Sequence, residues 1–392
     1  MADFDGTVEN LRRLLDTGRQ YWLVGAGISY GANIPLMYPL TSRVESLLTG
    51  NAKTIFADIK SQLPGNSHVE HVLSHLGDLI AIASRVTVKS AQIGTSNWSL
   101  ADLDSTYRAV VSNIATTVRY GYCAPTTAAP EQCGEPGASI VRVDDHLAFV
   151  RALFANRANL EARSNISFFT TNYDTLLEDA LCLLRRVPID GFTGSAIGFW
   201  DPVSAEQSRA ASLSNASPVY KLHGSVDWVL DPTYGLVRCR YDVNYLSATE
   251  NVLIYPQATK YVETQKDPFA HLFSAFRRAL ASPQSHVLAV SGFSFGDDHI
   301  NTEIDFALRS PEKKTNLVAF IKESAGATAG TFALPPVLDA WSQDIELRAR
   351  IYVATDKALY WNGQRFTAPG GTDMKWWSFT GMTQFLRDGS YQ

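Results

Sequence analysis

The stretch Tyr21–Ser29, YWLVGAGIS, runs from four apolar residues directly into two closely spaced glycines. An apolar run of this length that stops at glycine predicts a buried β-strand ending in a tight turn. Because glycine has no side chain, such a turn also allows a phosphate group to approach the backbone closely. A simple turn and a phosphate-binding loop therefore both fit this stretch when it is considered alone.

The spacing of these glycines argues against a hydride-transfer enzyme. The dinucleotide fingerprint of dehydrogenases, G-x-G-x-x-G, would need glycine at Tyr30. It also needs a second strand with an acidic end within about 20 residues, and no such strand is evident after Ser29.

After residue 165 short apolar runs alternate with helical patterns, which is typical of a parallel sheet covered by helices on both faces. The predicted strands are Ile166–Thr170, Val219–Leu222, His286–Ser291 and Leu317–Ile321, and the predicted helices are Asp174–Leu184, Pro268–Ala281 and Asp298–Leu308. The fold class is therefore predicted to be α/β.

Polar residues follow three of these strands at the point where each strand ends. They are Asn172 and Asp174, then His223, then Ser291 and its neighbours. Ligands of open α/β sheets bind at the carboxyl ends of the strands, so we expect these side chains to converge on one site. Asp174 could instead only cap the following helix, and a lone histidine is more often structural.

The remaining segments suggest one domain over residues 1–392. Its core is expected at 18–39 and 163–325, interrupted by a helical insertion at 40–162 that has no convincing strand and contains a loop at 121–139. Short antiparallel strands are expected between Ser225 and Tyr255. Residues 326–392 are expected to form an α/β extension with a hairpin at Asn362-Gly363.

Composition narrows the functional classes. The chain has a net charge of −5, without the basic excess of a nucleic-acid-binding protein, and no apolar run of about 18 residues that would span a membrane. Its four cysteines are too few and too scattered for a disulfide-stapled fold. We therefore expect a cytoplasmic protein that binds neither nucleic acid nor membrane directly.

Four motifs in this order resemble the sirtuin family. They are GAGIS at 25–29, TTNYD at 170–174, LHGS at 222–225 and SGFSFGD at 291–297. The residues in these motifs are closer to those of the sirtuin-like branch found in bacterial antiphage defence systems. The helix at 67–80 and the stretch from Ile254 through Tyr255 and Pro256 to Lys260 are also similar to that branch. The resemblance implies a Rossmann-like domain that binds NAD.

When the roles of the family's motif residues are assigned to the matching positions of this chain, the resemblance implies two sets of roles. Asn172 would hold the nicotinamide ribose or a water, and His223 would act as the base. The nucleotide-binding set would comprise Gly25, Ala26, Gly27 and Ser29 at the pyrophosphate, Asp174 near the nicotinamide carboxamide, and Ser291, Gly292, Phe293 and Ser294 on the adenosine side.

The chain departs from the deacetylating sirtuins at two places. It lacks their zinc module of two C-x-x-C pairs, because only Cys182 and Cys239 lie in that interval and two thiols cannot complete a tetrahedral zinc site. The family's G-I-P-D-F-R segment has Leu36, Met37 and Tyr38 at the acidic, aromatic and arginine positions. Both departures weaken the case for deacylation of a protein lysine.

Water then becomes the favoured acceptor of the ADP-ribosyl group of NAD. The sequence therefore predicts a zinc-free NAD glycohydrolase that releases nicotinamide and ADP-ribose. The resemblance implies an NAD-depleting effector of antiphage defence, a homo-oligomer, and a HerA-type hexameric ATPase as a partner. A module that binds NAD or ADP-ribose without turnover is the alternative, and a zinc-free deacylase is a weaker one.

One histidine cluster could suggest a metal site. His68, His71 and His75 recur at helical spacing with Glu70 beside them. The apolar stripe of the same helix places these histidines along one flank, so we assign no metal to the chain. His299 is expected to be a helix N-terminal residue rather than a second base.

Overall fold

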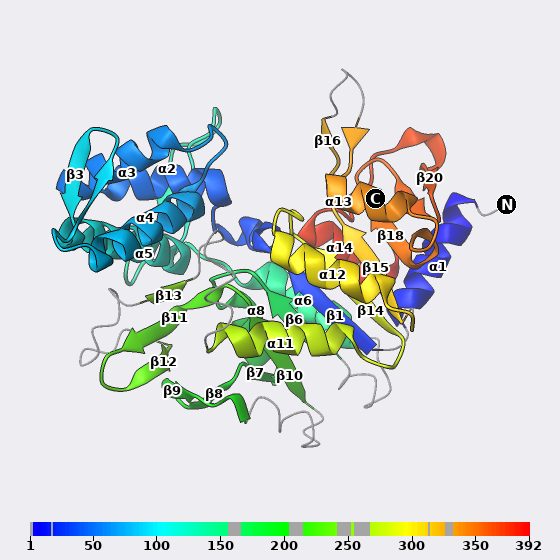
Figure 1. Ribbon diagram of the computed structural model, residues 1–392. Helices are drawn as coiled ribbons and strands as arrows, with labels where there is room; N and C mark the ends of the chain where they lie inside the picture. Colours follow the sequence, from blue (N-terminus) through cyan, green and yellow to red (C-terminus); the bar gives the residue numbers. More distant parts are fainter. Residues whose placement is uncertain are drawn as a thin grey trace.

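The computed structural model of the protein describes residues 3–16, 19–155, 166–203, 215–240, 252–254, 267–312, 314–325 and 332–392. A nine-stranded sheet forms its centre, in the order β20-β19-β18-β15-β14-β1-β6-β10-β7 (Figure 1). The strands are β1 (Arg19–Val24), β6 (Ile166–Thr170), β7 (Val187–Ile189), β10 (Ala216–Lys221), β14 (His286–Ser291), β15 (Thr315–Phe320), β18 (Ile351–Ala354), β19 (Leu359–Trp361) and β20 (Gln364–Phe366). Those from β7 to β18 are parallel, and β19 and β20 run antiparallel.

Successive residues of β1 serve the two faces of this sheet. Tyr21 and Leu23 belong to one hydrophobic cluster, and Trp22 and Val24 belong to the other. The first cluster includes residues of α11 (Phe269–Leu280), α12 (Asp298–Arg309) and α13 (Pro336–Gln343), and the second includes residues of α1 (Phe4–Asp16), α6 (Asp144–Ala155), α8 (Leu176–Leu183) and α14 (Phe379–Asp388). The predicted Rossmann-like α/β fold, with helices on both faces, is confirmed.

A helical lobe stands beside the sheet, drawn blue to cyan in Figure 1. It contains α2 (Met37–Leu47), α3 (Gly50–Gln62), α4 (Val69–Arg85) and α5 (Leu100–Tyr120), which share a third hydrophobic cluster. The expectation that the insertion at 40–162 holds no convincing strand is wrong. Two short hairpins occur there, β2 (Ser90–Ile93) with β3 (Ser96–Ser99) and β4 (Tyr122–Cys123) with β5 (Gln132–Cys133), and neither is long enough for a periodic apolar pattern.

A second, antiparallel sheet has the order β13-β11-β12-β9-β8. Its strands are β8 (Phe192–Gly194), β9 (Ile197–Trp200), β11 (Gly224–Asp231), β12 (Gly235–Cys239) and β13 (Val252–Ile254), and a separate two-residue pair is formed by β16 (Ser324–Ala325) and β17 (Phe332–Ala333). The antiparallel strands expected between Ser225 and Tyr255 are therefore present. Asn362 and Gly363, both at positive φ, turn the chain between β19 and β20, which confirms the predicted hairpin.

No helix in the part of the chain that the structure describes is long and apolar enough to cross a membrane.

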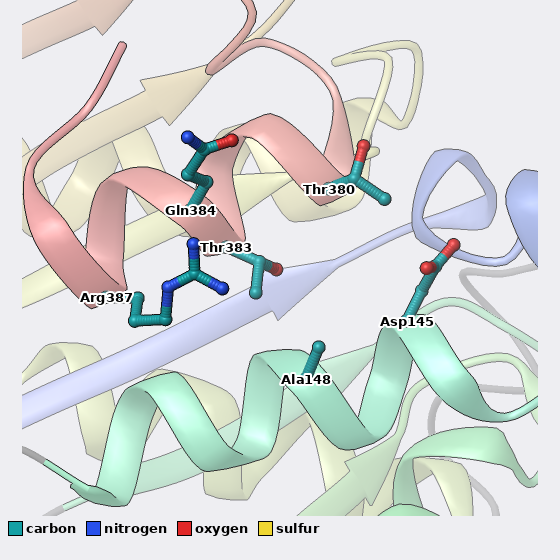
Figure 2. Close-up of a pocket in the computed structure, with 6 residues that line it drawn as sticks. All are labelled: Asp145, Ala148, Thr380, Thr383, Gln384 and Arg387. Atoms are coloured by element: carbon teal, nitrogen blue, oxygen red, sulfur yellow. The ribbon is translucent and has the colours of Figure 1, made fainter.

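A pocket of about 140 Å³ lies between α6 and α14 (Figure 2). His146 follows the pocket residue Asp145 in α6, and its side chain is fully buried. It packs against Phe379, with 5.0 Å between the ring centroids. Both ring nitrogens of His146 lack a hydrogen-bond partner among the described residues. Burial lowers the pKa of His146, against the opposing charges of Asp174 and Asp145, so the folded protein holds this imidazole neutral.

Replacing His146 with leucine should flatten the acid limb of the stability profile. The unfolded chain takes up a proton near the ordinary histidine pKa and the folded chain does so only at lower pH, so the wild type loses stability as pH falls below about 6.5. His146→Leu removes that proton uptake and two unpaired polar atoms, and it should gain roughly 1 kcal/mol at pH 8. Urea unfolding at pH 5 and pH 8 measures both effects, and an unchanged difference between the two pH values would refute the assignment.

Candidate functional site

The carboxyl ends of β1 and β6 meet through the side chain of Ser29. Val24 and Thr170, which end these strands, pair in the parallel register, so the loops that follow them start side by side. The Ser29 hydroxyl donates to Asp174 Oδ2 at 2.8 Å and accepts from Asn172 Nδ2 at 3.0 Å. All three predicted site residues are therefore joined in one buried network.

The network fixes the orientation of the Asn172 amide. Its Nδ2 donates to Ser29, and its backbone N–H donates to Thr170 Oγ1 at 3.0 Å. Its Oδ1 is buried and has no partner in the described part of the structure. A buried amide oxygen normally accepts a hydrogen bond, so Oδ1 is placed to receive one from a ligand hydroxyl or a water.

Asp174 serves the helix and the site together. Its Oδ1 accepts from the Leu176 N–H at 3.0 Å at the start of α8, while its Oδ2 accepts from Ser29. Asp174 therefore holds the start of α8 with one oxygen and the loop after β1 with the other, and a contact with nicotinamide stays a prediction.

His223 lies just after β10 and is held by Asp297. The His223 Nε2 and Asp297 Oδ2 are 3.0 Å apart, and both side chains are almost fully buried. An ionised carboxylate can only accept, so this contact orients the ring with an N–H at Nε2. Asp297 is in turn fixed as the N-cap of α12, where Oδ1 accepts from the backbone N–H of His299. His299 is thus a helix N-terminal residue, as predicted.

A close backbone contact joins the glycine turn after β1 to the loop after β14. The N–H groups of Gly25 and Gly27 donate to the carbonyls of Ser291 and Gly292, each at 3.0 Å. A Cβ on Gly25 would lie 2.6 Å from the Gly292 oxygen, and one on Gly292 would lie 2.5 Å from the Ile28 nitrogen. These glycines are therefore required by the contact between the two loops, whatever they bind.

The rest of the predicted adenosine side is divided between core and surface. Ser291 Oγ is buried without a hydrogen-bond partner in the described ranges, which suits a ligand contact. Phe293 is buried against Phe295 in the core, with 5.2 Å between the ring centroids. Ser294 is exposed, and its Oγ accepts from the Gly296 N–H at 3.3 Å.

The histidine cluster of the helical lobe serves the helix itself. His71 Nδ1 accepts from the His68 N–H at 3.2 Å at the start of α4. Within the described residues, no group of three or more His, Cys, Asp or Glu side chains is arranged to hold a metal ion. The four cysteines are free. The similarity noted from Tyr255 to Lys260 lies outside the described residues.

Residues 166–343 match the family model of a SIR2-like domain. The matched segment runs from β6 to α13 and contains Asn172, Asp174, His223 and Asp297, whereas the glycine turn precedes it. The match supports a sirtuin-like family, and SIR2-like domains use NAD. A search of the curated proteins found no match.

Sequence reasoning missed one partner in this SIR2-like segment. Asp297 closes the SGFSFGD motif, and its short polar side chain before a helix predicts an N-cap. Its contact with His223 joins residues 74 positions apart, which no local pattern reports.

Adding a methyl group at Gly292 should destabilise the protein far more than adding one at Gly235. Both glycines have positive φ, +67° and +73°, so alanine meets a similar backbone strain of about 1–2 kcal/mol at each. Only at Gly292 would the new Cβ also collide with backbone, since nothing lies within 4 Å at Gly235. We expect Gly292→Ala to cost at least about 2 kcal/mol more than Gly235→Ala in chemical unfolding. Equal losses would show that the loops do not depend on this contact.

Proposed function

We propose that this protein is an NAD glycohydrolase that cleaves NAD to nicotinamide and ADP-ribose. The observation that carries the proposal is the placement of two oriented groups after the ends of neighbouring strands, the Asn172 amide after β6 and the imidazole held by Asp297 after β10. The SIR2-like match supports NAD as the substrate.

The chemistry suits these side chains. Breaking the bond between nicotinamide and ribose builds positive charge on the sugar, which is stabilised by positioned polar groups rather than by a strong nucleophile. Asn172 Oδ1 would accept from a ribose hydroxyl or hold the attacking water. The imidazole of His223 would take the proton that the water loses, and Asp297 would stabilise the resulting imidazolium.

Two unpartnered buried oxygens support a nucleotide in this place. Asn172 follows β6 and Ser291 ends β14, the two strands on either side of β1, and neither Asn172 Oδ1 nor Ser291 Oγ has a hydrogen-bond partner among the described residues. We propose that the turn of Gly25, Ala26, Gly27 and Ser29 lies against the pyrophosphate, and that residues 291–294 lie on the adenosine side. The N–H groups of Gly25 and Gly27 are bonded to the loop after β14, so these two glycines shape the turn rather than donate to the phosphate.

The biological setting is also a proposal. An NAD-consuming enzyme must be restrained in a resting cell, and the resemblance to defence sirtuins suggests a cytoplasmic homo-oligomer controlled by a HerA-type ATPase. Activation would then deplete NAD during phage infection. The net charge of −5 supports a division of labour in which any DNA contact belongs to the partner.

The reaction is tested by measuring nicotinamide release from NAD by the purified protein, alone and together with the product of its neighbouring gene. We expect release without any acylated peptide. Bound nucleotide with no release in either mixture would favour a binding module instead, and release that requires an acetylated peptide would favour a deacylase.

Asn172→Ala and His223→Ala should each lower turnover about a hundredfold or more, because each removes a group aimed at the reacting atoms. Both variants should keep the wild-type circular dichroism spectrum. A variant that retains near-normal turnover would refute the role given to that residue.

Asp297→Asn isolates the effect of the carboxylate on His223. Asparagine is as good an N-cap as aspartate, so α12 should remain intact. The amide carries no charge to stabilise an imidazolium, and turnover should fall at least about tenfold. The neighbouring Asp298→Asn, at an exposed position of the same helix, is the matched control and should stay at the wild-type rate. Equal rates for the two variants would contradict the assignment.

A further inference from the structure

Tyr173 lies between Asn172 and Asp174 on the loop after β6, and its side chain reaches the helical lobe. Its hydroxyl donates to Glu70 Oε1 of α4 at 2.5 Å. Tyr173 and Glu70 are 6% and 3% exposed, so the hydrogen bond is shielded from water. The aromatic ring also belongs to the hydrophobic cluster of the lobe, together with Leu176 and Val226.

The backbone of the same loop is held from the side of the sheets. The carbonyl of Tyr173 accepts from Ser225 Oγ at 3.2 Å and from the Val226 N–H at 2.9 Å. The carbonyl of Asp174 accepts from the buried ammonium of Lys221, which also pairs with Glu178 at 3.3 Å. The loop is thus fixed through its carbonyls by the sheets and through the phenol of Tyr173 by the lobe.

We propose that Glu70 is a positioning residue, which holds the Asn172–Asp174 loop in its active geometry through the hydrogen bond from Tyr173. This inference rests on the proposed NAD hydrolysis for its effect on turnover. It gives the buried carboxylate of α4 a role in the reaction without contact with the substrate.

The position of Tyr173 in the chain explains why its hydrogen bond matters. The peptide units on its two sides carry Asn172 and Asp174, and both of these side chains are bonded to Ser29. A rotation of Tyr173 would tilt both units and move the Asn172 amide away from Ser29. A misplacement of about 1 Å in a catalytic group can cost around a hundredfold in rate.

The donor of this hydrogen bond stays protonated well above neutral pH. Burial raises the pKa of Tyr173 well above its ordinary value, and the charge of Glu70 and the hydrogen bond to it act in the same direction. The phenol therefore keeps the proton that it donates. A hydrogen bond to a carboxylate is about twice as strong as one between neutral groups, which suits a contact that must hold a loop in place.

The test compares variants that remove this hydrogen bond with variants that keep it. Tyr173→Phe removes the donor, Glu70→Ala removes the acceptor, and Glu70→Gln retains an acceptor oxygen and serves as the conservative rescue. The control is Tyr360→Phe, because Tyr360 also donates to a buried glutamate, Glu323 Oε1 at 3.0 Å, but lies on β19, which is next to the edge strand β20 and far from β6.

Two quantities are measured on each full-length variant: the kinetics of nicotinamide release, and hydrogen–deuterium exchange of peptides that cover residues 170–176. We expect Tyr173→Phe and Glu70→Ala to lower kcat about tenfold with KM within about twofold, and to speed exchange in this loop about tenfold. Glu70→Gln and Tyr360→Phe should stay near the wild type in both. If Tyr173→Phe does not fold, the comparison of Glu70→Ala with Glu70→Gln decides.

The inference is overturned if Tyr173→Phe behaves like Tyr360→Phe, or if Glu70→Gln is as impaired as Glu70→Ala. The exchange measurement separates this failure from a failure of the proposed reaction. A wild type that releases no nicotinamide would refute the hydrolase, whereas loop exchange would still show whether Glu70 holds the loop.

Discussion

The hydroxyl of Ser29 is the contact on which the arrangement of the site depends. It accepts from Asn172 and donates to Asp174, and so it joins the loop after β1 to the loop after β6. That junction is possible because Val24 and Thr170 end their strands in register. The contact between the glycine turn and Gly292 brings in a third loop, after β14, at the same edge of the sheet.

The polar side chains at this junction divide into those that hold the loops and those that face a ligand. Ser29 uses its donor and its acceptor within the protein, which leaves Asn172 Oδ1 as the atom directed to a ligand. Asp297 plays the corresponding part for His223, because its hydrogen bond with Nε2 fixes the orientation of the imidazole ring. Each proposed reacting group is thus oriented by a neighbour that is itself held by a second contact.

The sequence predicted the elements whose signal is local. β6 and β14 have the bounds expected for them, since both are apolar runs that end in polar residues. It did not predict β18, α3 or α14, and it treated the residues of β18 as part of an extension although β18 pairs in parallel with β15. The apolar run of β18 is only four residues long, and its place is decided by a partner strand more than 30 residues away.

The candidate site was likewise predicted only as far as local motifs reach. Motif spelling singled out Ser29, Asn172, Asp174 and His223, and the structure brings the first three into one network. It did not show that Asp297 holds His223 or that Glu70 holds Tyr173, because these pairs are 74 and 103 residues apart. Glu70 had appeared only as a neighbour of three histidines, whose spacing reflects the flank and the start of α4.

Hydrolysis of NAD with water as the acceptor is the central claim, and isotopic labelling tests it most directly. The purified protein is incubated with NAD in water enriched in heavy oxygen, and the ADP-ribose formed is analysed by mass spectrometry. A sample of unlabelled ADP-ribose in the same water corrects for exchange at the anomeric carbon. We predict heavy oxygen in the ADP-ribose as it forms, at a rate equal to nicotinamide release. Release of nicotinamide with no labelled ADP-ribose would show that another group accepts the ribose and would contradict the account.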